Sequence, residues 1–186
     1  MSQFIAILDA CVLYPAPVRD ILLSLAAIGL FQPKWTDEIK EEWVRNLLEK
    51  RKDLKRGQLA RTVAAMNKAF RYANVTDYDD LIPSLQLPDE DDRHVLASAI
   101  KSEANVILTF NLKDFPDKTL ETFQLKAQNP DDFILELFEQ SKGVVCEAIK
   151  RMISRLQNPP KTKDDIVETL RKCKLLQAAE KIKECC

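Results

Sequence analysis

Apolar and polar residues follow one another along this chain in a pattern that predicts strands separated by helices. The run Phe4 to Leu8 is apolar and ends at Asp9, as expected of a buried strand that brings a polar residue to its carboxyl end. Val106 to Thr109 is a second run of this kind. Phe31 to Trp35 and Leu85 to Leu87 are expected to be shorter extended stretches.

The segments between these runs carry apolar residues every three or four positions, which is the spacing of amphipathic helices. Thr36 is predicted to cap one of them at its N-terminus, and Gly29 to end another. Strands that alternate with helices predict an α/β domain with a mainly parallel sheet. The expected helices are Val18 to Ile28, Thr36 to Leu47, Gln58 to Tyr72 and a segment from the acidic run at Asp89 through Ile100.

The chain changes character after residue 129, because only helical periodicity is found from Pro130 onward. We therefore predict an α/β domain over residues 1–128 and an all-helical C-terminal extension over residues 129–186. The apolar face of the extension is expected to pack on the first domain or to extend a dimer surface. Its predicted helices are Asp131 to Gln140, Val144 to Leu156, Thr162 to Arg171 and Leu175 to Cys185.

Composition adds little to this pattern. The 186 residues are 46% hydrophobic and 31% charged, with three glycines, which is typical of a helix-rich globular protein. A formal net charge of -1 neither indicates a nucleic-acid-binding protein nor excludes one. The apolar run at the N-terminus is too short to span a membrane or to act as a secretory segment, so we expect no membrane association.

The chain has five cysteines, at positions 11, 146, 173, 185 and 186. None forms a Cys-x-x-Cys pair, and with the single His94 they provide no zinc-binding set. The odd number and the lack of a secretory segment predict a reducing, cytoplasmic environment. Cys185 and Cys186 are accordingly expected to be free thiols.

Acidic residues recur where predicted strands end or helices begin. In an open α/β sheet, ligands bind beyond the carboxyl ends of the strands, and Asp9 and the turn Asn111 to Asp114 are expected to share that side. Carboxylates brought together repel one another unless a cation is bound between them. Oxygen ligands favour Mg²⁺ or Mn²⁺, ions that activate water and neutralise charge on a phosphate. Asp9 is the strongest candidate, because a buried carboxylate without a partner is destabilising.

Several acidic residues have a simpler explanation. Carboxylates in the first turn of a helix stabilise it through its dipole and its free N–H groups. We assign this role to Asp37, Glu38, Asp89 and Glu90. The single His94 is expected to be a packing or surface residue, because histidine chemistry needs a partner that the sequence does not identify.

Four segments in order resemble the motifs of PIN domains. LDACVL at 8–13 resembles the opening motif, and TDEIKEEW at 36–43 resembles the second, a hydroxyl residue followed on the same helix by a glutamate. DRHVLASA at 92–99 is similar to the third, and TFNLKDF at 109–115 to the fourth. The resemblance covers residues 4–116, and the spacing is most similar to bacterial VapC-type toxins that carry a helical C-terminal extension.

The resemblance implies a three-layer fold with a divalent-metal site. Asp9, Glu42 and Asp92 would be metal ligands and catalytic residues. The fourth corner departs from the family, because Asn111 stands where many members have an aspartate, so either Asn111 or Asp114 completes the site and a second metal is in question. Neighbouring helical residues point about 100° apart, so Glu41 competes with Glu42 and Asp91 with Asp92. Residues expected to orient the ligands are Thr36, Asp91 and Thr109.

The densest basic segment follows the helix that carries Glu42. It could hold RNA phosphates along the rim of the acidic site, or it could be a solvated surface. Aromatic residues could stack on bases, although the spacing of Trp35, Trp43, Phe70 and Tyr72 favours the core for most of them. The basic candidates for RNA binding are Lys50, Arg51, Lys52, Lys55 and Arg56.

The resemblance implies a metal-dependent endoribonuclease, the toxin of a type II toxin–antitoxin pair in the cytoplasm, with a cognate antitoxin protein and commonly a homodimer. An alternative is a catalytically weak PIN-like module that binds nucleic acid or a partner protein. A phosphatase of the haloacid-dehalogenase type also has an aspartate after its first strand. It needs a second aspartate two residues later, and here that residue is Cys11.

Overall fold

A computed structural model of the chain describes residues 4–186, the side chain of residue 185 excepted. The chain divides into two compact units, one made of the residues up to Tyr14 together with Phe31–Gln128 and the other of Pro15–Leu30 together with Asn129–Cys186. The segment Pro15–Leu30, which the sequence assigned to the first domain, is thus grouped with the C-terminal helices. The predicted boundary at residue 128, between an α/β domain and a helical extension, stays a prediction.

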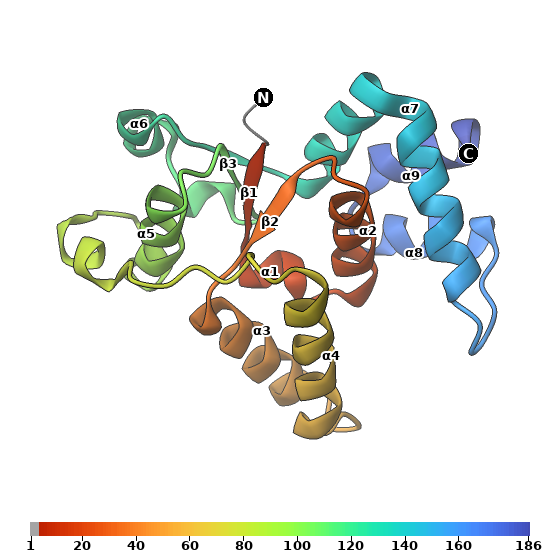
Figure 1. Cartoon of the computed structure of the whole chain (residues 1–186), viewed down its shortest axis with the longest axis horizontal. Coiled ribbons are helices and arrows are strands. Elements are labelled where there is room, and N and C mark those ends of the chain that lie inside the picture. The colour runs from red at the N-terminus through yellow and green to blue at the C-terminus, as the bar shows by residue number, and fades with distance from the viewer. Residues whose placement is uncertain (1–3) are drawn as a thin grey trace. The chain divides into compact units, whose positions relative to one another are not determined.

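The first unit contains a parallel sheet of four strands in the order β2-β1-β3-β4 (Figure 1). Ala6 of β1 lies opposite Pro33 of β2 and Val106 of β3, so β1 and β3 occupy the centre. Their central position explains why both are continuous apolar runs, since central parallel strands are covered on both faces. The parallel sheet confirms the predicted fold class. The strands are β1 Ile5–Leu8, β2 Gln32–Lys34, β3 Val106–Leu108 and β4 Lys126–Gln128.

Two expectations about strands were wrong. Leu85 to Leu87 is not a strand, because the short 3-10 helix η1, Asp79–Ser84, is followed by a loop in which Leu85 is buried. The edge strand β4 was missed. Its residues run from exposed to intermediate to buried, so it carries no apolar run or clear alternation that would reveal it in the sequence.

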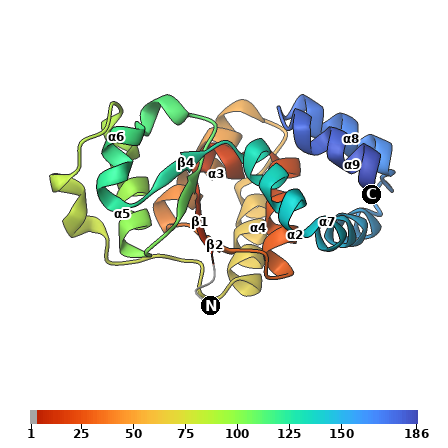
Figure 2. The same ribbon diagram turned by 90° about the horizontal axis from the view of Figure 1, so that it is seen from above.

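Helices cover both sides of this sheet and produce three layers. Helix α5, Arg93–Lys101, packs against β1 and β3. Figures 1 and 2 show α5 on one side of the strands and helices α3, Asp37–Lys50, and α4, Arg56–Ala69, on the other. The unit also contains α1, Ala10–Leu13, α6, Asp117–Leu120, and the 3-10 helices η2, Glu90–Asp92, η3, Leu112–Asp114, and η4, Glu121–Phe123.

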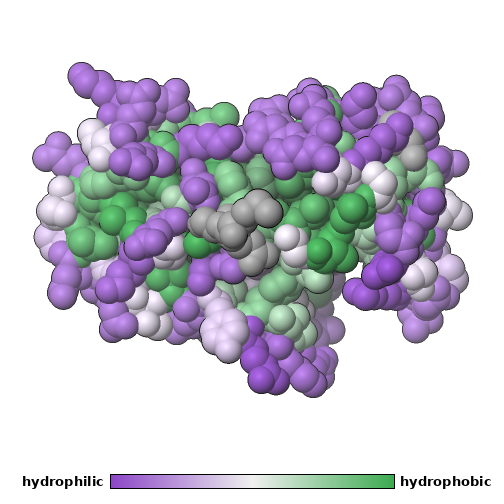
Figure 3. Space-filling view, turned by 45° about the horizontal axis from the view of Figure 1, so that its top comes forward, coloured by the Kyte–Doolittle hydropathy of each residue, from purple (hydrophilic) through white to green (hydrophobic). Residues whose placement is uncertain are grey.

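The core of this unit lies between the sheet and its helices. Ile7, Leu8, Trp35 and Trp43 are fully buried. Polar residues occupy much of the outer surface, and Figure 3 shows hydrophilic areas with smaller hydrophobic ones between them on one face. Tyr72 departs furthest from this arrangement among the exposed aromatic residues, because it is 88% exposed.

Thr36 caps α3 as the sequence predicted. Its Oγ1 accepts a hydrogen bond from the N–H of Ile39 at 3.0 Å, and the residue is fully buried. The cap fixes the start of α3 directly after β2, at the carboxyl end of the sheet. Helix α3 therefore carries Glu38 and Glu42 to that end.

Replacing Thr36 by Ala is expected to destabilise the protein by about 1 kcal/mol, because the N–H of Ile39 loses its acceptor. For a chain of this size that corresponds to a fall in melting temperature of roughly 2–4 °C. Thermal denaturation followed by circular dichroism measures the change. Thr36→Ser keeps the hydroxyl and serves as the control; a melting temperature for Thr36→Ala equal to that of the wild type would contradict the assigned cap.

In the described residues the second unit is built from helices, with one isolated β-bridge between Gln157 and Pro160. Asp131, at the start of its longest helix, accepts hydrogen bonds from the N–H groups of Gln177 (2.9 Å) and Ala178 (2.8 Å), so one helix caps another. The two helices predicted on either side of residues 141–143 form one element, in which Ser141 alone is non-helical (φ -152°, ψ 53°). The helices are α2 Ala16–Ala27, α7 Pro130–Arg155, α8 Lys163–Lys172 and α9 Leu176–Cys185.

The prediction that Cys185 and Cys186 are free thiols was wrong for Cys186, and for Cys185 it falls on a side chain outside the described structure. Cys186 forms a disulfide with Cys146, 40 residues away in the sequence, because α9 packs against α7 and brings the two sulfurs together. Cys11 and Cys173 are free thiols. Across residues 4–186, none of the helices combines the length and the hydropathy that crossing a membrane requires.

Candidate active site

Asp9 follows β1 directly and lies at the carboxyl end of the sheet. Its N–H continues the ladder by donating to the carbonyl of Leu108 at 3.1 Å, and the residue is only 4% exposed. The N–H of Ala10 donates to Oδ1 at 2.6 Å, and the hydroxyl of Thr109, which follows β3, donates to Oδ2 at 2.7 Å. Both carboxylate oxygens are thus held by groups that come from the ends of the two central strands.

Burial dominates the electrostatics of Asp9. Loss of solvent raises the pKa of its carboxyl group above the usual value, and the charge of Glu42 raises it further. Hydrogen bonds from Thr109, Cys11 and Ala10 oppose this shift but do not cancel it. No lysine or arginine forms an ion pair with Asp9 in the part of the chain that the structure describes. The carboxylate is therefore buried without a neutralising charge.

Asp92 ends η2 and precedes α5, which places it near Asp9. Its pKa is raised to about 7, first because the carboxyl is partly buried and then because of the charges of Asp9, Asp89, Asp114 and Glu42. An aspartate whose pKa approaches neutrality beside other acids indicates a cluster of carboxylates that repel one another. The predicted residues of the first three motifs are thus brought into electrostatic contact.

Glu42 faces the same cluster from α3 and contacts a histidine. Its Oε2 lies 3.7 Å from Nε2 of His94, while Oε2 of Glu38, one turn earlier on α3, lies 3.6 Å from Nδ1. Burial lowers the pKa of His94, but contact with Glu42 and the charges of Glu38, Glu42 and Asp9 outweigh it, so the pKa is raised overall. His94 is thus a buried histidine held between two glutamates, which favour its charged form.

The fourth corner contains an amide and a carboxylate. Asn111 is exposed and its N–H donates to Oγ1 of Thr109 at 3.0 Å. The side chain of Asp114 is 17% exposed, and Nζ of Lys113 is 4.0 Å from its Oδ1. Both residues line the same pocket, so the geometry leaves both as candidates to complete the site.

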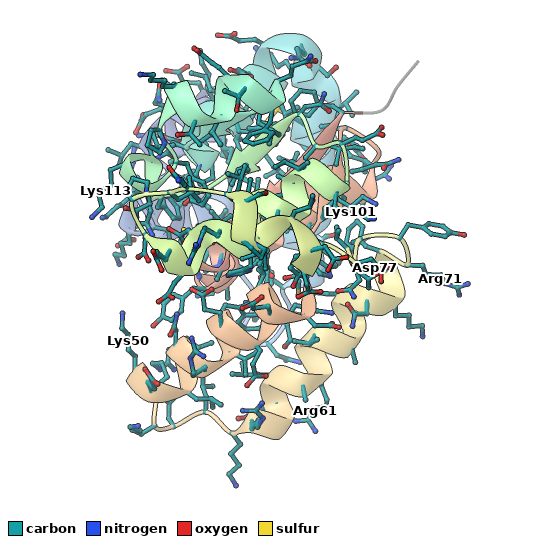
Figure 4. The ribbon with its side chains drawn as sticks, turned by 90° about the vertical axis from the view of Figure 1, so that its left-hand side faces the viewer. Lys50, Arg61, Arg71, Asp77, Lys101 and Lys113 are labelled. Atoms are coloured by element: carbon teal, nitrogen blue, oxygen red, sulfur yellow. A yellow bond between two sulfur atoms is a disulfide. The ribbon has the colours of Figure 1, made fainter. Side chains whose placement is uncertain are left out.

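These side chains line a pocket of about 660 Å³ between α3, η2 and η3. In Figure 4, Lys113 and Lys50 lie at one side of this region and Arg71 at the other. Among the described residues the lining contains one arginine against a majority of acids. The lining residues are Glu38, Glu41, Glu42, Arg45, Ile82, Asp89, Glu90, Asp91, Asp92, His94, Asn111 and Asp114.

The competing neighbours differ in their contacts. Glu41 is held by Arg56 of α4, whose Nη2 lies 2.6 Å from Oε1 and 2.8 Å from Oε2. Asp91 is exposed, and its N–H donates to Oδ1 of Asp89 at 3.0 Å. Thr36 is engaged as the cap of α3, whereas Thr109 binds Asp9 directly. Of the predicted orienting residues, Thr109 is the one in contact with a predicted ligand.

The predicted RNA-binding segment is partly neutralised within the protein. Arg51 pairs with Asp53 at 2.6 Å, and Arg56 pairs with Glu41. The ammonium of Lys50 lies 5.4 Å from the ring centre of Tyr14. Lys52 and Lys55 are exposed and form no ion pair in the described structure. A role of this segment in RNA binding stays a prediction.

Sequence reasoning missed His94 and Glu38 as parts of the site. Glu38 had been interpreted as a helix-start residue and His94 as a packing or surface residue. The spacing of Glu38 and Glu42, four residues apart on one helix face, is a signal that both point the same way. The histidine two positions after Asp92 could then have been placed between them only with the helix packing known.

The donor set fits a hard divalent cation. It consists of carboxylate oxygens, with Asp9 and Asp92 disfavoured as anions by their surroundings, and an amide oxygen is available from Asn111. Within the described part of the chain, Nδ1 of His94 is buried without a hydrogen-bond partner. Among the described residues, however, no three acidic, histidine or cysteine side chains lie close enough together to hold a metal ion. The side chains therefore have the donor atoms that such an ion prefers, but they are not positioned to coordinate one.

Comparison with known proteins found two family models and one relative. A model described as "PIN domain" matches residues 6–113, and one described as "VapC50 C-terminal domain" matches residues 130–184. A protein of Mycobacterium tuberculosis (strain ATCC 25618 / H37Rv) named "Putative ribonuclease VapC50" is 39% identical over 93 residues. This match covers 50% of the chain and 54% of the relative, so the chain spans about half the length of the curated relative it matches. No solved structure matches the chain.

Proposed function

The chain belongs to the PIN-domain family, and from this premise we propose that it is a metal-dependent endoribonuclease that hydrolyses RNA phosphodiester bonds. One observation carries the proposal. The buried carboxylate of Asp9 interacts electrostatically with Asp92 and Glu42 at the carboxyl end of the parallel sheet, and all three lie within the residues matched by the family model. A pocket of about 660 Å³ adjoins them, open to a substrate.

We propose that Asp9, Glu42 and Asp92 hold the cation, Mg²⁺ or Mn²⁺, with Asn111 or Asp114 as the fourth protein ligand. Such an ion, when bound, supplies a Lewis acid that activates a water molecule and neutralises charge on the phosphate. An amide at the fourth corner provides an oxygen without a charge. It therefore favours one tightly bound ion over two.

The surrounding residues orient these ligands. The hydroxyl of Thr109 and the N–H of Ala10 each hold one oxygen of Asp9, which fixes the orientation of its carboxylate. The ring of His94, buried between Glu38 and Glu42, restricts the position of the Glu42 carboxylate. Asp92 contributes a carboxyl group whose pKa of about 7 leaves it partly protonated until the other acids are neutralised.

Replacing Thr109 by Val is expected to lower both RNA cleavage and Mn²⁺ affinity by roughly 10- to 100-fold, because Asp9 loses the donor that holds its Oδ2. Val keeps the branched shape of Thr but lacks the hydroxyl, so the change removes the bond to Asp9 together with the bond from the N–H of Asn111. Cleavage rates and Mn²⁺-dependent thermal shifts provide the measurements. Thr109→Ser should restore both, and a Val variant that cleaves as fast as the wild type would remove Thr109 from the site.

The proposed function is tested by incubating the purified protein with tRNA and rRNA in Mg²⁺, in Mn²⁺ and in EDTA. Cleavage with either ion and none in EDTA is the expected result. The alternative function is that of a catalytically weak module. It is favoured by Asn111, which stands at the position where the resemblance implies an aspartate. That alternative is favoured if RNA stays intact at every metal concentration while the protein still binds it.

The VapC-type resemblance extends the proposal to partners. We propose that the chain is the toxin of a type II pair in the cytoplasm, that a cognate antitoxin protein covers the acidic pocket, and that the protein forms a homodimer. The matched C-terminal model and the name of the mycobacterial relative support this assignment. Co-expression with the product of a neighbouring small gene, followed by co-purification and loss of cleavage, tests the pairing.

A further inference from the structure

A second pocket in the first unit combines basic residues with an exposed aromatic ring. It has a volume of about 330 Å³ and lies between β2 and the segment that follows α4. This volume is at the lower end of the range of small-ligand pockets, about 300–1,000 Å³. The residues that matter are Lys34 on β2, Lys68 on α4, and Arg71 and Tyr72 in the turn after α4. We call this pocket the Lys34–Tyr72 groove.

The basic residues of the groove have no acidic partner in the described structure. The ammonium of Lys34 donates to the carbonyl of Tyr72 at 2.5 Å, and desolvation alone lowers its pKa. Lys68 and Arg71 are exposed and form no ion pair within residues 4–186. Figure 4 shows Arg71 extending outward beyond the end of α4, away from Arg61 in the middle of the helix. Three cations that no carboxylate neutralises within the described residues favour an anionic ligand.

Tyr72 provides a flat apolar surface beside these cations. Trp35 and Trp43 are fully buried, whereas Tyr72 is 88% exposed. The turn that carries it is held from below, because the ring of Phe70 meets Trp35 edge-on at 5.9 Å and the N–H of Trp35 donates to the carbonyl of Ala73 at 3.0 Å. An exposed aromatic ring on a turn held in this way, next to basic side chains, is an arrangement on which bases of single-stranded nucleic acids stack.

The groove is close to the acidic pocket along the chain. Lys34 is the last residue of β2, and Glu38, which lines the acidic pocket, follows four residues later. Four residues of fully extended chain span at most about 14 Å. One strand of RNA can therefore contact both surfaces.

We propose that the Lys34–Tyr72 groove binds a nucleotide of single-stranded RNA next to the cleavage site, with Lys34, Lys68 and Arg71 on the phosphates and Tyr72 stacked on a base. This inference rests on the proposed ribonuclease function and assigns it a substrate-binding surface apart from the basic segment at residues 50–56. In that segment Arg51 and Arg56 are paired with carboxylates, whereas no cation of the groove forms an ion pair within the described residues.

Binding is tested in an Asp9→Asn background, so that the RNA is not cut. The probe is a fluorescein-labelled ten-residue oligouridine, with an abasic ribose-phosphate chain of equal length as the comparison, and affinity is read from fluorescence anisotropy at several salt concentrations. Tyr72→Ala is expected to weaken binding of oligouridine roughly 5- to 100-fold and to leave the abasic chain unaffected, because only the former has bases to stack. Tyr72→Phe should retain the wild-type affinity.

The basic residues are tested through the salt dependence. Lys68→Gln and Arg71→Gln should each reduce the slope of log K against log salt by about 0.7, the value for one phosphate contact on a single strand. Lys118→Gln removes the same charge from α6, which packs on the opposite edge strand β4, and should change neither slope nor affinity. These side chains are exposed, so melting temperatures are expected to stay constant.

The outcomes separate the two proposals. If the oligouridine binds and none of the groove variants alters its affinity or salt slope, the groove proposal is overturned and the ribonuclease proposal stands. If the unmodified protein cleaves RNA and the groove variants raise KM without changing kcat, both are supported. Equal losses for Lys118→Gln and Arg71→Gln would show a general charge effect and likewise overturn the groove.

Discussion

Replacing Asp9 by Asn is expected to abolish RNA cleavage and at the same time to raise the melting temperature of the metal-free protein. The two effects have one cause. Among the described residues Asp9 is a buried carboxylate without a basic partner, so in the proposed site it would bind the cation, and it destabilises the metal-free protein. Stability and activity are therefore predicted to change in opposite directions at this residue.

The loss of activity follows from the loss of a charged ligand. A metal ion at such a site contributes several kcal/mol to stabilising the transition state. Since 1.36 kcal/mol corresponds to a tenfold change in rate, cleavage should fall by about 10³-fold or more. Asp92→Asn removes a carboxylate from the same cluster and is expected to have an effect of similar size. Cleavage of RNA in Mn²⁺ by both variants and the wild type provides the measurement, and equal rates for all three would refute the site.

The gain in stability follows from the direction of the pKa shift. Folding raises the pKa of Asp9, so at neutral pH the ionised carboxylate favours the unfolded chain, and this destabilisation grows as the pH rises above the unfolded pKa. Asn keeps the shape and can still accept from the N–H of Ala10. Each kcal/mol gained corresponds to roughly 2–4 °C. Melting in EDTA measures this gain.

Added Mn²⁺ provides the control for the stability of Asp9→Asn. A ligand at 100 times its Kd stabilises the native state by about 2.7 kcal/mol, so the wild type should shift upward. The Asn variant should not shift. A metal-free melting temperature below that of the wild type would contradict the assigned electrostatic penalty.

Exchange of Glu42 for Gln is expected to reduce cleavage at least about 100-fold, whereas the same exchange at Glu41 should leave it within about twofold. Glu42 faces Asp9 and Asp92, and its charge raises the pKa of both. Glu41 is bound to Arg56 instead. The two residues are adjacent and chemically identical. A difference between the two variants therefore reports the direction in which each side chain points.

The stability of the two glutamate variants completes the comparison. Glu41→Gln breaks an exposed ion pair, with side chains 53% and 64% exposed, and such pairs contribute about 0–1 kcal/mol. Its Mn²⁺-dependent thermal shift should match that of the wild type, while Glu42→Gln should show little shift. A reversed order, with Glu41→Gln inactive and Glu42→Gln active, would exchange their roles.

Local patterns in the sequence were sufficient for much of the fold. The apolar run before Asp9 specified a central parallel strand, because a strand covered on both faces has apolar residues at every position. Thr36 specified the start of α3, because its hydroxyl satisfies a free N–H three residues later. Where no local signal existed, prediction failed. The strand β4 has a mixed pattern, and the disulfide partner of Cys186 lies 40 residues away.

The sequence by itself determined which residues are able to form the site and in what order they occur, since strand ends, helix caps and family motifs are short-range features. Only the tertiary structure decided which of them meet. The bond between Thr109 and Asp9 joins the ends of two strands that are neighbours in the sheet but about a hundred positions apart in the chain. The packing of α3 and α4 decides where three side chains point. It directs Glu42 toward the acidic cluster, Glu41 toward Arg56 and Tyr72 into solvent. The sequence pattern is equally consistent with Glu41 or Glu42 facing the site. Only the packing of the helices decides which of the two does so.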